Sequence, residues 1–259
     1  MEQDCYLIEM KTNICTLDSA VNKVINLVKN KSGAYVCISN VHMCMEVYDS
    51  KDFRTAVNSA DLIVPDGRPL FFAQKLLGHS QAEQVRGQDL MNALCSISGT
   101  EKTSIGLYGG FDDEVLDSVQ IALKRMFPHI NIVYSFSPPF RKLSKAEDDE
   151  IISNISSSGV DILFVGIGCP KQEYWMAEHK NKLNCVMLGV GAAFDFISGN
   201  KKHAPKWMQK VGLEWLFRLL SEPKRLWKRY LKQNPRFIYY FLQQWLLKRD
   251  FTKEGPKNV

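Results

Sequence analysis

One carboxylate in the sequence stands where an enzyme would place a base. The run 61–64, apolar from Leu62 onward, is closed by Pro65, Asp66 and Gly67, so Asp66 lies at the end of a predicted strand. In a parallel sheet such a position faces the crevice where ligands bind, and a carboxylate there can accept a proton from an attacking hydroxyl. Asp-Gly is equally an ordinary turn pair, and position alone leaves both interpretations open.

Three glycine turns follow other predicted strands. Gly109 begins one of them, Gly168 and Lys171 lie in the segment 166–173, and Gly191 lies in the segment 189–195. In the last two segments, backbone N–H groups open onto a predicted helix N-terminus, which suits a phosphate or a diphosphate. Neither segment matches a Walker loop or a complete GxGxxG fingerprint, so glycine as a simple strand terminator is the alternative.

Arg86 is suited to neutralise a departing diphosphate, because a guanidinium makes forked contacts with phosphate oxygens. A surface ion pair with Asp89 is the alternative. Metal-binding patterns are missing from the sequence: it has no HExxH and no Asp-x-Asp, and its five histidines are far apart. We therefore expect no metal and no cofactor, with basic side chains and backbone amides stabilising the leaving group. The lack of a Gly-x-Ser-x-Gly elbow disfavours a serine hydrolase.

The elements that would position these residues show βαβ rhythm. A chain of 259 residues, 45% of them hydrophobic, can bury one sizeable core plus an appendage. Over residues 1–199, β-branched runs alternate with amphipathic helical patterns, which predicts a Rossmann-like α/β body with a mostly parallel sheet. The predicted strands are 5–9, 34–39, 61–64, 104–108, 131–135, 161–166 and 185–189, and the predicted helices are 17–30, 50–59, 69–77 and three beginning near 112, 144 and 170.

The last 60 residues differ in charge from the rest. Residues 200–259 hold 15 of the 33 Lys and Arg but 4 of the 28 Asp and Glu, a formal charge of +11, whereas residues 1–199 carry −6. An acidic body with a basic tail indicates contact with an anionic surface, either nucleic acid or acidic lipid.

The sequence of residues 200–259 predicts two helices. Apolar residues between 213 and 220 share one helical face, and Pro223 stands at a typical first position of a second, basic and amphipathic helix. Beyond Pro235, residues 237–247 are almost wholly apolar, but they fall short of the roughly 20 needed to cross a bilayer. Interleaved aromatics favour a membrane interface, with a core role as the alternative. We predict a membrane-associating appendage at 200–250 and a disordered tail at 251–259.

The strand-end turns and the tail together resemble the WecG/TagA/CpsF family of bacterial glycosyltransferases. The resemblance extends over nearly the whole chain and rests on six motifs at sensible spacing. They are VPDG at 64–67, VRGQDL at 85–90, GIGCPKQEYW at 166–175, GVGAAFDF at 189–196 with Gly199, APKWMQ at 204–209 and GLEWLFRLLSEPKR at 212–225.

This resemblance implies an inverting, metal-independent transferase whose C-terminal appendage reaches the membrane and helps complete the active site. The best-known members transfer N-acetylmannosamine, or its uronic acid, from UDP to GlcNAc linked through diphosphate to undecaprenol. Others transfer another hexose or uronic acid in exopolysaccharide assembly. We expect a UDP-sugar donor and a polyprenyl-diphosphate acceptor in polysaccharide or teichoic-acid synthesis. The resemblance also implies that self-association into a homo-oligomer can compete with docking of the appendage.

The resemblance assigns roles to particular residues by motif position. Asp66 would be the general base, Arg86 and Gln172 would contact the donor or the leaving group, and Asp195 would touch the nucleoside. Further implied contacts are the polar pair Ser39 and Asn40, where the family often has Thr at the first position, and the diphosphate clamp Arg218, Arg225 and Lys228. Lys228 stands where the family often has Arg, and a lysine cannot make the same forked contact; Arg229 follows it.

Two other functions are alternatives to the glycosyltransferase hypothesis. One is a nucleotide-binding module whose basic tail docks on RNA or DNA, and the other is an NAD-linked oxidoreductase, which the incomplete dinucleotide fingerprint disfavours. The seven scattered cysteines contain no CxxC pair, and the N-terminal residues show no secretory pattern. We expect a cytoplasmic protein, peripheral on the inner face of the plasma membrane, with no nucleic-acid partner.

Overall fold

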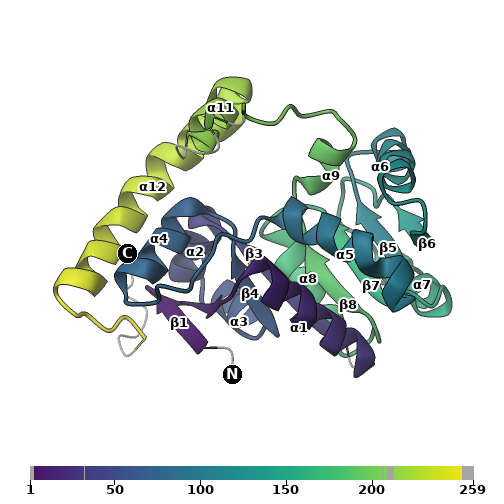
Figure 1. Ribbon diagram of the computed structural model, residues 1–259, viewed down its shortest axis with the longest axis horizontal. Helices are drawn as coiled ribbons and strands as arrows, with labels where there is room; N and C mark the ends of the chain where they lie inside the picture. Colours follow the sequence, from purple (N-terminus) through teal and green to yellow (C-terminus); the bar gives the residue numbers. More distant parts are fainter. Residues whose placement is uncertain (1–2, 32, 206, 209–212, 253–259) are drawn as a thin grey trace.

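Six strands form one parallel sheet in the computed structural model, which describes residues 3–31, 33–205, 207–208 and 213–252 (Figure 1). The strands are β3 (Ala34–Ser39), β4 (Leu62–Pro65), β5 (Ser104–Gly109), β6 (Asn131–Phe136), β7 (Ile162–Gly166) and β8 (Val186–Gly189). Their spatial order is β4-β3-β8-β7-β5-β6, and every neighbouring pair is parallel. The predicted α/β class with a parallel sheet is confirmed.

Helices cover both faces of the sheet, which explains why β3, β5 and β8 are buried at every residue. Side chains of β3 alternate between two cores: Tyr35 and Cys37 face one, and Val36 and Ile38 face the other. The first core is lined by α2 (Val41–Asp49), α3 (Lys51–Asn58), α7 (Lys145–Ser157) and α8 (Lys171–His179). The second is lined by α1 (Leu17–Lys29), α5 (Gly87–Glu101), α6 (Asp113–Met126) and α9 (Ala193–Ile197).

Most predicted elements are found within one or two residues of their expected bounds. Helix α4 (Arg68–Leu76), which follows β4, also matches the predicted helix 69–77. Helices α2 and α5 are not among the predicted ones. The apolar sequence of α2 buries Val41, Met43, Cys44, Met45 and Val47, and such a nearly continuous apolar run shows little helical periodicity.

The prediction that 5–9 is a strand of the main sheet is wrong. β1 (Gln3–Leu7) and β2 (Met10–Ile14) form a separate antiparallel hairpin. Its turn lacks the Asn-Gly or Asp-Gly pair typical of hairpins and instead holds Ile8 at φ 62°. Gln244, near the C-terminus, closes this turn: its Oε1 accepts from the Ile8 N–H at 2.9 Å, and its Nε2 donates to the Tyr6 carbonyl at 2.8 Å.

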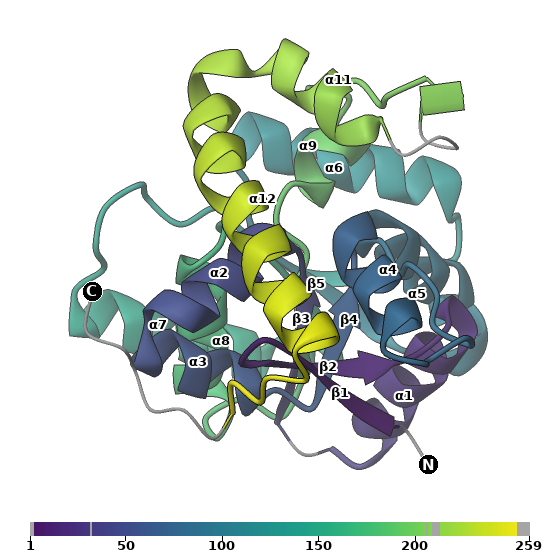
Figure 2. The same cartoon turned by 90° about the vertical axis from the view of Figure 1, so that its left-hand side faces the viewer.

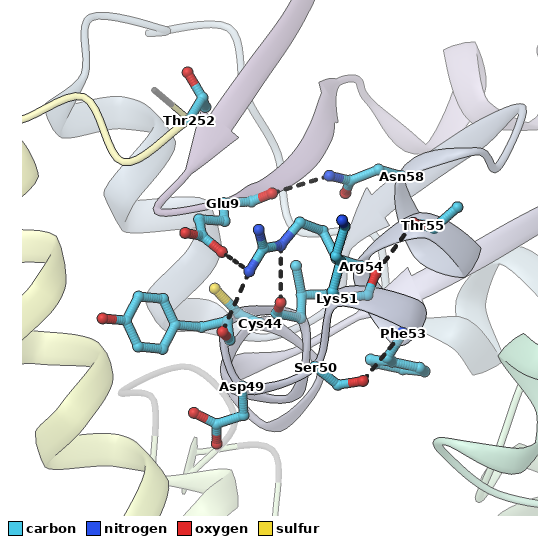
Figure 3. Close-up of polar contacts among 12 residues, drawn as sticks. Glu9, Cys44, Asp49, Ser50, Lys51, Phe53, Arg54, Thr55, Asn58 and Thr252 are labelled. Carbon is cyan, nitrogen blue, oxygen red and sulfur yellow. Dashed lines mark hydrogen bonds and ion pairs between the residues drawn. The ribbon is translucent and has the colours of Figure 1, made fainter. Parts of the chain in front are cut away.

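A polar network fastens the hairpin to α3 (Figure 3). The guanidinium of Arg54 pairs with the buried Glu9 carboxylate, and its Nε also donates to the Val47 carbonyl at 3.2 Å. Asn58 donates to the Glu9 carbonyl at 2.9 Å and accepts from the Lys11 N–H at 2.9 Å. These contacts therefore hold the hairpin against α2 and α3.

The described part of the C-terminal appendage includes α11 (Glu214–Ser221) and the long α12 (Pro223–Leu246). Helix α12 continues through Pro235, so the predicted basic helix and the apolar stretch after it are one element. Figures 1 and 2 show α12 running from α11 down across α2 toward the hairpin. Phe237 and Phe241 are buried in the first core, whereas Tyr239 is 60% exposed. The aromatics of this segment thus divide between core and surface.

No helix among the described residues is long and apolar enough to cross a membrane. Lys206, Gln209 and Gly212 of the quoted motifs lie outside the described residues, as does most of the predicted disordered tail, residues 253–259.

Candidate active site

Asp66 lies at the carboxyl end of β4, beside the end of β3. The N–H groups of Asp66 and Gly67 both donate to the Ser39 carbonyl, at 2.9 and 3.2 Å. A Cβ on Gly67 would stand 3.3 Å from the Cα of Asn40, so glycine permits this close approach. The two strand ends therefore bring Asp66 and Asn40 to one site, where Asn40 also caps α2 by accepting from the Met43 N–H at 3.2 Å.

The Asp66 carboxyl has the electrostatics of a base that works near neutral pH. Its pKa is raised to about 7, mainly by burial; the charges of Glu214 and Asp89 contribute to the rise, and those of Arg218 and Arg86 oppose it. A catalytic base is most effective when its pKa is close to the working pH. Buried carboxyls with such shifted pKa values are concentrated in functional sites, although ion-pair networks also produce them.

Arginines from three helices surround the same space. Arg86 directly precedes α5 and lies 3.6 Å from the Glu214 carboxylate of α11, while Arg218 belongs to α11 and Arg229 to α12. Burial and the nearby charges of Arg225 and Arg218 lower the pKa of Arg229. In the part of the chain that the structure describes, Nε of Arg218 and Nε of Arg229 are buried without a hydrogen-bond acceptor. Such a cluster favours a multiply charged anion.

Two glycine turns meet at Gln172, the second residue of α8. The Gly168 N–H donates to Oε1 of Gln172 at 3.2 Å, and Nε2 of Gln172 donates to the buried Glu173 carboxylate at 2.8 Å. Gly168 has φ 85° and Gly191 has φ 53°, a region that glycine adopts without strain. A Cβ on Gly189 would stand 2.9 Å from Nε2 of Gln172, so the second turn packs directly against this amide.

These residues enclose two pockets that share a boundary. The smaller one, about 380 Å³, contains Asp66, and the larger one, about 860 Å³, lies toward β5 and α6. Four residues line both pockets: Gly168, Gly191, Ala192 and Arg225. A ligand whose charged middle rested on the two glycine turns would extend into both pockets.

Most of the predicted site residues line one or both pockets. The smaller pocket is lined by Asn40, Asp66, Arg86, Gln172 and Arg218, the larger by Lys171 and Asp195, and both by Gly168, Gly191 and Arg225. The pocket linings do not include Ser39, Gly109 or Lys228.

Each of these three has another contact. The buried Ser39 hydroxyl donates to the Val64 carbonyl at 2.8 Å, so it ties β3 to β4. Gly109 packs against the backbone of Gly166, where a Cβ would stand within 2.6 Å of it. Nζ of Lys228 lies 5.6 Å from the centre of the Trp227 ring, and it is the following residue, Arg229, that lines the smaller pocket.

Sequence reasoning missed several lining residues of the smaller pocket. His42 lies in the first turn of α2, and burial together with the charge of Arg229 lowers its pKa to about 4, so its imidazole is neutral at pH 7. His203 stacks on Phe196 with ring centres 4.7 Å apart, and the Arg218 guanidinium lies 5.5 Å from the same ring. The histidines are far apart in the sequence, and no local pattern indicates that they meet.

The arrangement combines a proton acceptor with an anion site. A carboxyl with a pKa near 7 stands in one pocket with arginines and glycine turns, which suits a reaction in which a hydroxyl attacks and a phosphate-bearing group departs. Among the described residues, no three His, Cys, Asp or Glu side chains are grouped as a metal site would require.

Comparison with known proteins agrees with this chemistry. The model of the glycosyl transferase WecG/TagA/CpsF family matches residues 5–251. The chain is 31% identical over 207 residues to the N-acetylglucosaminyldiphosphoundecaprenol N-acetyl-beta-D-mannosaminyltransferase of Bacillus spizizenii. The aligned region covers 80% of this chain and 77% of the relative.

Two further relatives have the same name. The Bacillus subtilis protein is 28% identical over 233 residues, which cover 89% of this chain and 88% of the relative's length. The Staphylococcus aureus protein is 32% identical over 184 residues, which cover 71% of this chain and 69% of the relative's length. With a family match over nearly its whole length, and with the motifs around Asp66 and Gln172 folded onto one pocket, the chain belongs to the WecG/TagA/CpsF family and is a glycosyltransferase.

Proposed function

We propose that this enzyme moves N-acetylmannosamine, or its uronic acid, from UDP onto a saccharide linked through diphosphate to undecaprenol. The relatives' names state an N-acetylmannosaminyl group and a GlcNAc-diphosphoundecaprenol acceptor, which supports the sugar and the lipid carrier. The UDP donor, inversion at the anomeric carbon and independence from metal are our own inferences for this chain.

The observation that carries the proposal is the position of Asp66 in a pocket lined by arginines and bounded by glycine turns. In the proposed reaction the acceptor hydroxyl gives its proton to the Asp66 carboxylate. Its oxygen bonds to the anomeric carbon from one face as the bond from that carbon to the diphosphate oxygen breaks on the other. The configuration is therefore inverted, and UDP leaves.

The departing diphosphate needs compensation for the negative charge that develops on it. The turns at Gly168 and Gly191 and the side chain of Arg225 border both pockets, and Arg218, whose buried Nε has no hydrogen-bond acceptor among the described residues, lines the smaller one. Preorganised donors of this kind stabilise charge in a transition state by several kcal/mol, roughly 3–4 for a single donor. These groups supply the proposed metal-independent stabilisation.

The appendage supports a place at the inner face of the membrane. Trp215, Trp227 and Trp245 are each at least 39% exposed, and Lys224, Lys228 and Lys232 are exposed along α12. Aromatic residues and lysines on one helical appendage suit the interface of an anionic bilayer, where each basic residue contributes about 1 kcal/mol. A peripheral position would bring the lipid-linked acceptor to the smaller pocket. We treat residues 1–199 as the catalytic body and 200–250 as the membrane-associating appendage.

The test is release of UDP by the full-length protein from a panel of UDP-sugars, with and without GlcNAc-diphosphate-lipid in anionic vesicles. We expect acceptor-dependent release with UDP-N-acetylmannosamine or its uronic acid. Acceptor-dependent release with another UDP-sugar alone would correct the sugar and keep the mechanism. Absence of release with every pair, from protein shown to be folded, would contradict the proposed donor and acceptor together.

A further inference from the structure

Two phenylalanines at the larger pocket are unusually exposed. Phe111 is 75% exposed and Phe140 is 85% exposed, and their ring centres lie 6.4 Å apart. Phe111 follows β5, and Phe140 belongs to the loop between β6 and α7, so the two meet from separate strand ends. Neither ring is buried enough to stabilise the fold, yet both line the pocket. A ligand that covered them would gain the apolar burial that folding leaves unused.

The loop that presents Phe140 is held in place by its own contacts. Pro138 and Pro139 restrict its backbone, and the Arg141 N–H donates to the Pro139 carbonyl at 2.8 Å. Arg141 also pairs with Glu147 through two N–H···O contacts of 2.9 and 2.5 Å. A loop fixed before binding loses less conformational entropy when a ligand arrives.

A cation stands beside the same ring. Nζ of Lys171 lies 4.8 Å from the centre of Phe140, and Lys171 is the first residue of α8, directly after the glycine turn at Gly168. The larger pocket thus joins an aromatic rim to a phosphate-binding turn. This combination matches a nucleoside diphosphate, which has a flat base at one end and a dianionic diphosphate at the other.

We propose that Phe111 and Phe140 form the stacking platform for the nucleobase of the donor. This inference rests on the proposed function in one respect, namely that the donor is a nucleoside diphosphate sugar. With the diphosphate on the turns shared by both pockets, the sugar enters the smaller pocket beside Asp66, and the nucleoside enters the larger one. Stacking is tolerant of base identity, so the platform supplies affinity rather than a choice between bases.

The experiment measures equilibrium binding by calorimetry with the full-length protein, using UDP and inorganic pyrophosphate as separate probes. The variants are Phe111→Ala, Phe140→Ala and the pair together, and Phe72→Ala is the control because it removes a half-exposed phenylalanine of α4 that lines neither pocket. We expect each single variant to weaken UDP binding roughly fivefold or more, and the pair roughly a hundredfold, from the usual size of base stacking on aromatic side chains. Pyrophosphate affinity should be unchanged.

Several outcomes would overturn the platform. Equal loss of UDP and pyrophosphate affinity would mean that the loop supports the phosphate site instead, and unchanged UDP affinity would remove both rings from the nucleoside. If the double variant kept its UDP affinity but lost binding to anionic vesicles, the pair would be a membrane contact. Binding of a different nucleoside diphosphate in place of UDP, with the same loss in the variants, would support the platform and contradict the UDP donor of the proposed function.

Discussion

Arg236 of α12 forms a two-point ion pair with Asp49 at the end of α2, with N···O distances of 2.8 and 2.5 Å. Both side chains are about a third exposed, and exposed ion pairs contribute only about 0–1 kcal/mol. Truncating a buried phenylalanine costs about 3–5 kcal/mol, and Phe237 and Phe241 are buried beside this pair. The apolar face therefore holds the appendage on the body, and the ion pair aligns it.

We expect Phe241→Ala to release α12, whereas Arg236→Ala should leave it docked. Loss of docking would take Arg225 and Arg229 away from the pockets, so transferase activity should fall at least tenfold. Hydrogen exchange of α12 amides measures the release directly, and Tyr239→Ala, two residues away on the exposed face, is the matched control. Unchanged exchange in Phe241→Ala would mean that other contacts hold the helix.

The body of the fold could be predicted because its signals are local. Strand β3 lies at the predicted residues 34–39, since a parallel strand covered on both faces is a continuous apolar run. The hairpin could not be predicted, because its turn has no typical turn pair, holds Ile8 at a positive φ and is bonded to Gln244, which lies 236 residues away along the chain. Local propensity does not reveal such a contact.

The site divides in the same way. Asp66 and Gly168 can be predicted because they follow β4 and β7 within two residues, and both strands are recognisable in the sequence. His42 could not be predicted, and the sequence left open whether Lys228 or Arg229 completes the site, because both depend on how α12 docks on α2. Gln233 of α12 lies 3.3 Å from Glu46 of α2, a contact across 187 residues. Which of two adjacent basic residues, Lys228 or Arg229, enters the pocket is decided by the rotation of the docked helix.

Replacing Asp66 tests the proposed base. Asp66→Asn keeps the shape of the side chain but cannot accept the proton, and general base catalysis typically contributes 10²–10⁴-fold. We expect kcat to fall by roughly that factor while UDP affinity changes little. Single-turnover transfer and UDP calorimetry on the same preparation separate the two effects, and Asp52→Asn on the exposed side of α3 is the control. Full activity of Asp66→Asn would remove this residue from the role of base.

The same substitution should stabilise the protein in a pH-dependent way. Burial raises the pKa of Asp66 from 3.8 to about 7, so the folded chain holds this proton more tightly than the unfolded chain. Its contribution to stability is fully present below pH 3.8 and is lost as the pH rises through 7. Asparagine does not titrate, so Asp66→Asn should raise Tm more at pH 8 than at pH 5.

Thermal unfolding of both proteins at half-unit steps of pH measures this difference. Burial also raises the pKa of Glu173 to about 7, but Glu173 is present in both proteins and cancels in the comparison. A gain in Tm that is constant from pH 5 to pH 8 would mean that Asp66 is not desolvated in the folded state.

Three exposed lysines of α12 should govern attachment to anionic membranes. Lys224, Lys228 and Lys232 follow one another at intervals of four residues, which places them on one helical face. At about 1 kcal/mol each near an anionic surface, the triple substitution to Gln should weaken partitioning into anionic vesicles roughly a hundredfold. UDP affinity should be unchanged, since none of the three lines a pocket. Equal partitioning of the variant and the parent protein would assign the attachment to the aromatic residues alone.

Arg54 should be among the most sensitive positions outside the site, because it neutralises Glu9 (Figure 3), whose side chain is only 6% exposed. Removing one partner of a buried pair leaves an uncompensated charge and costs about 3–5 kcal/mol. We expect Arg54→Met to lower the free energy of unfolding in urea by that amount, whereas Lys51→Met, on the exposed side of the same helix, should change it by less than about 0.5 kcal/mol. The double variant Glu9→Gln/Arg54→Met should recover part of the loss, because no charge then remains buried. A loss below about 1 kcal/mol in Arg54→Met would mean that water reaches Glu9 and that the hairpin is fastened to α3 mainly by Asn58.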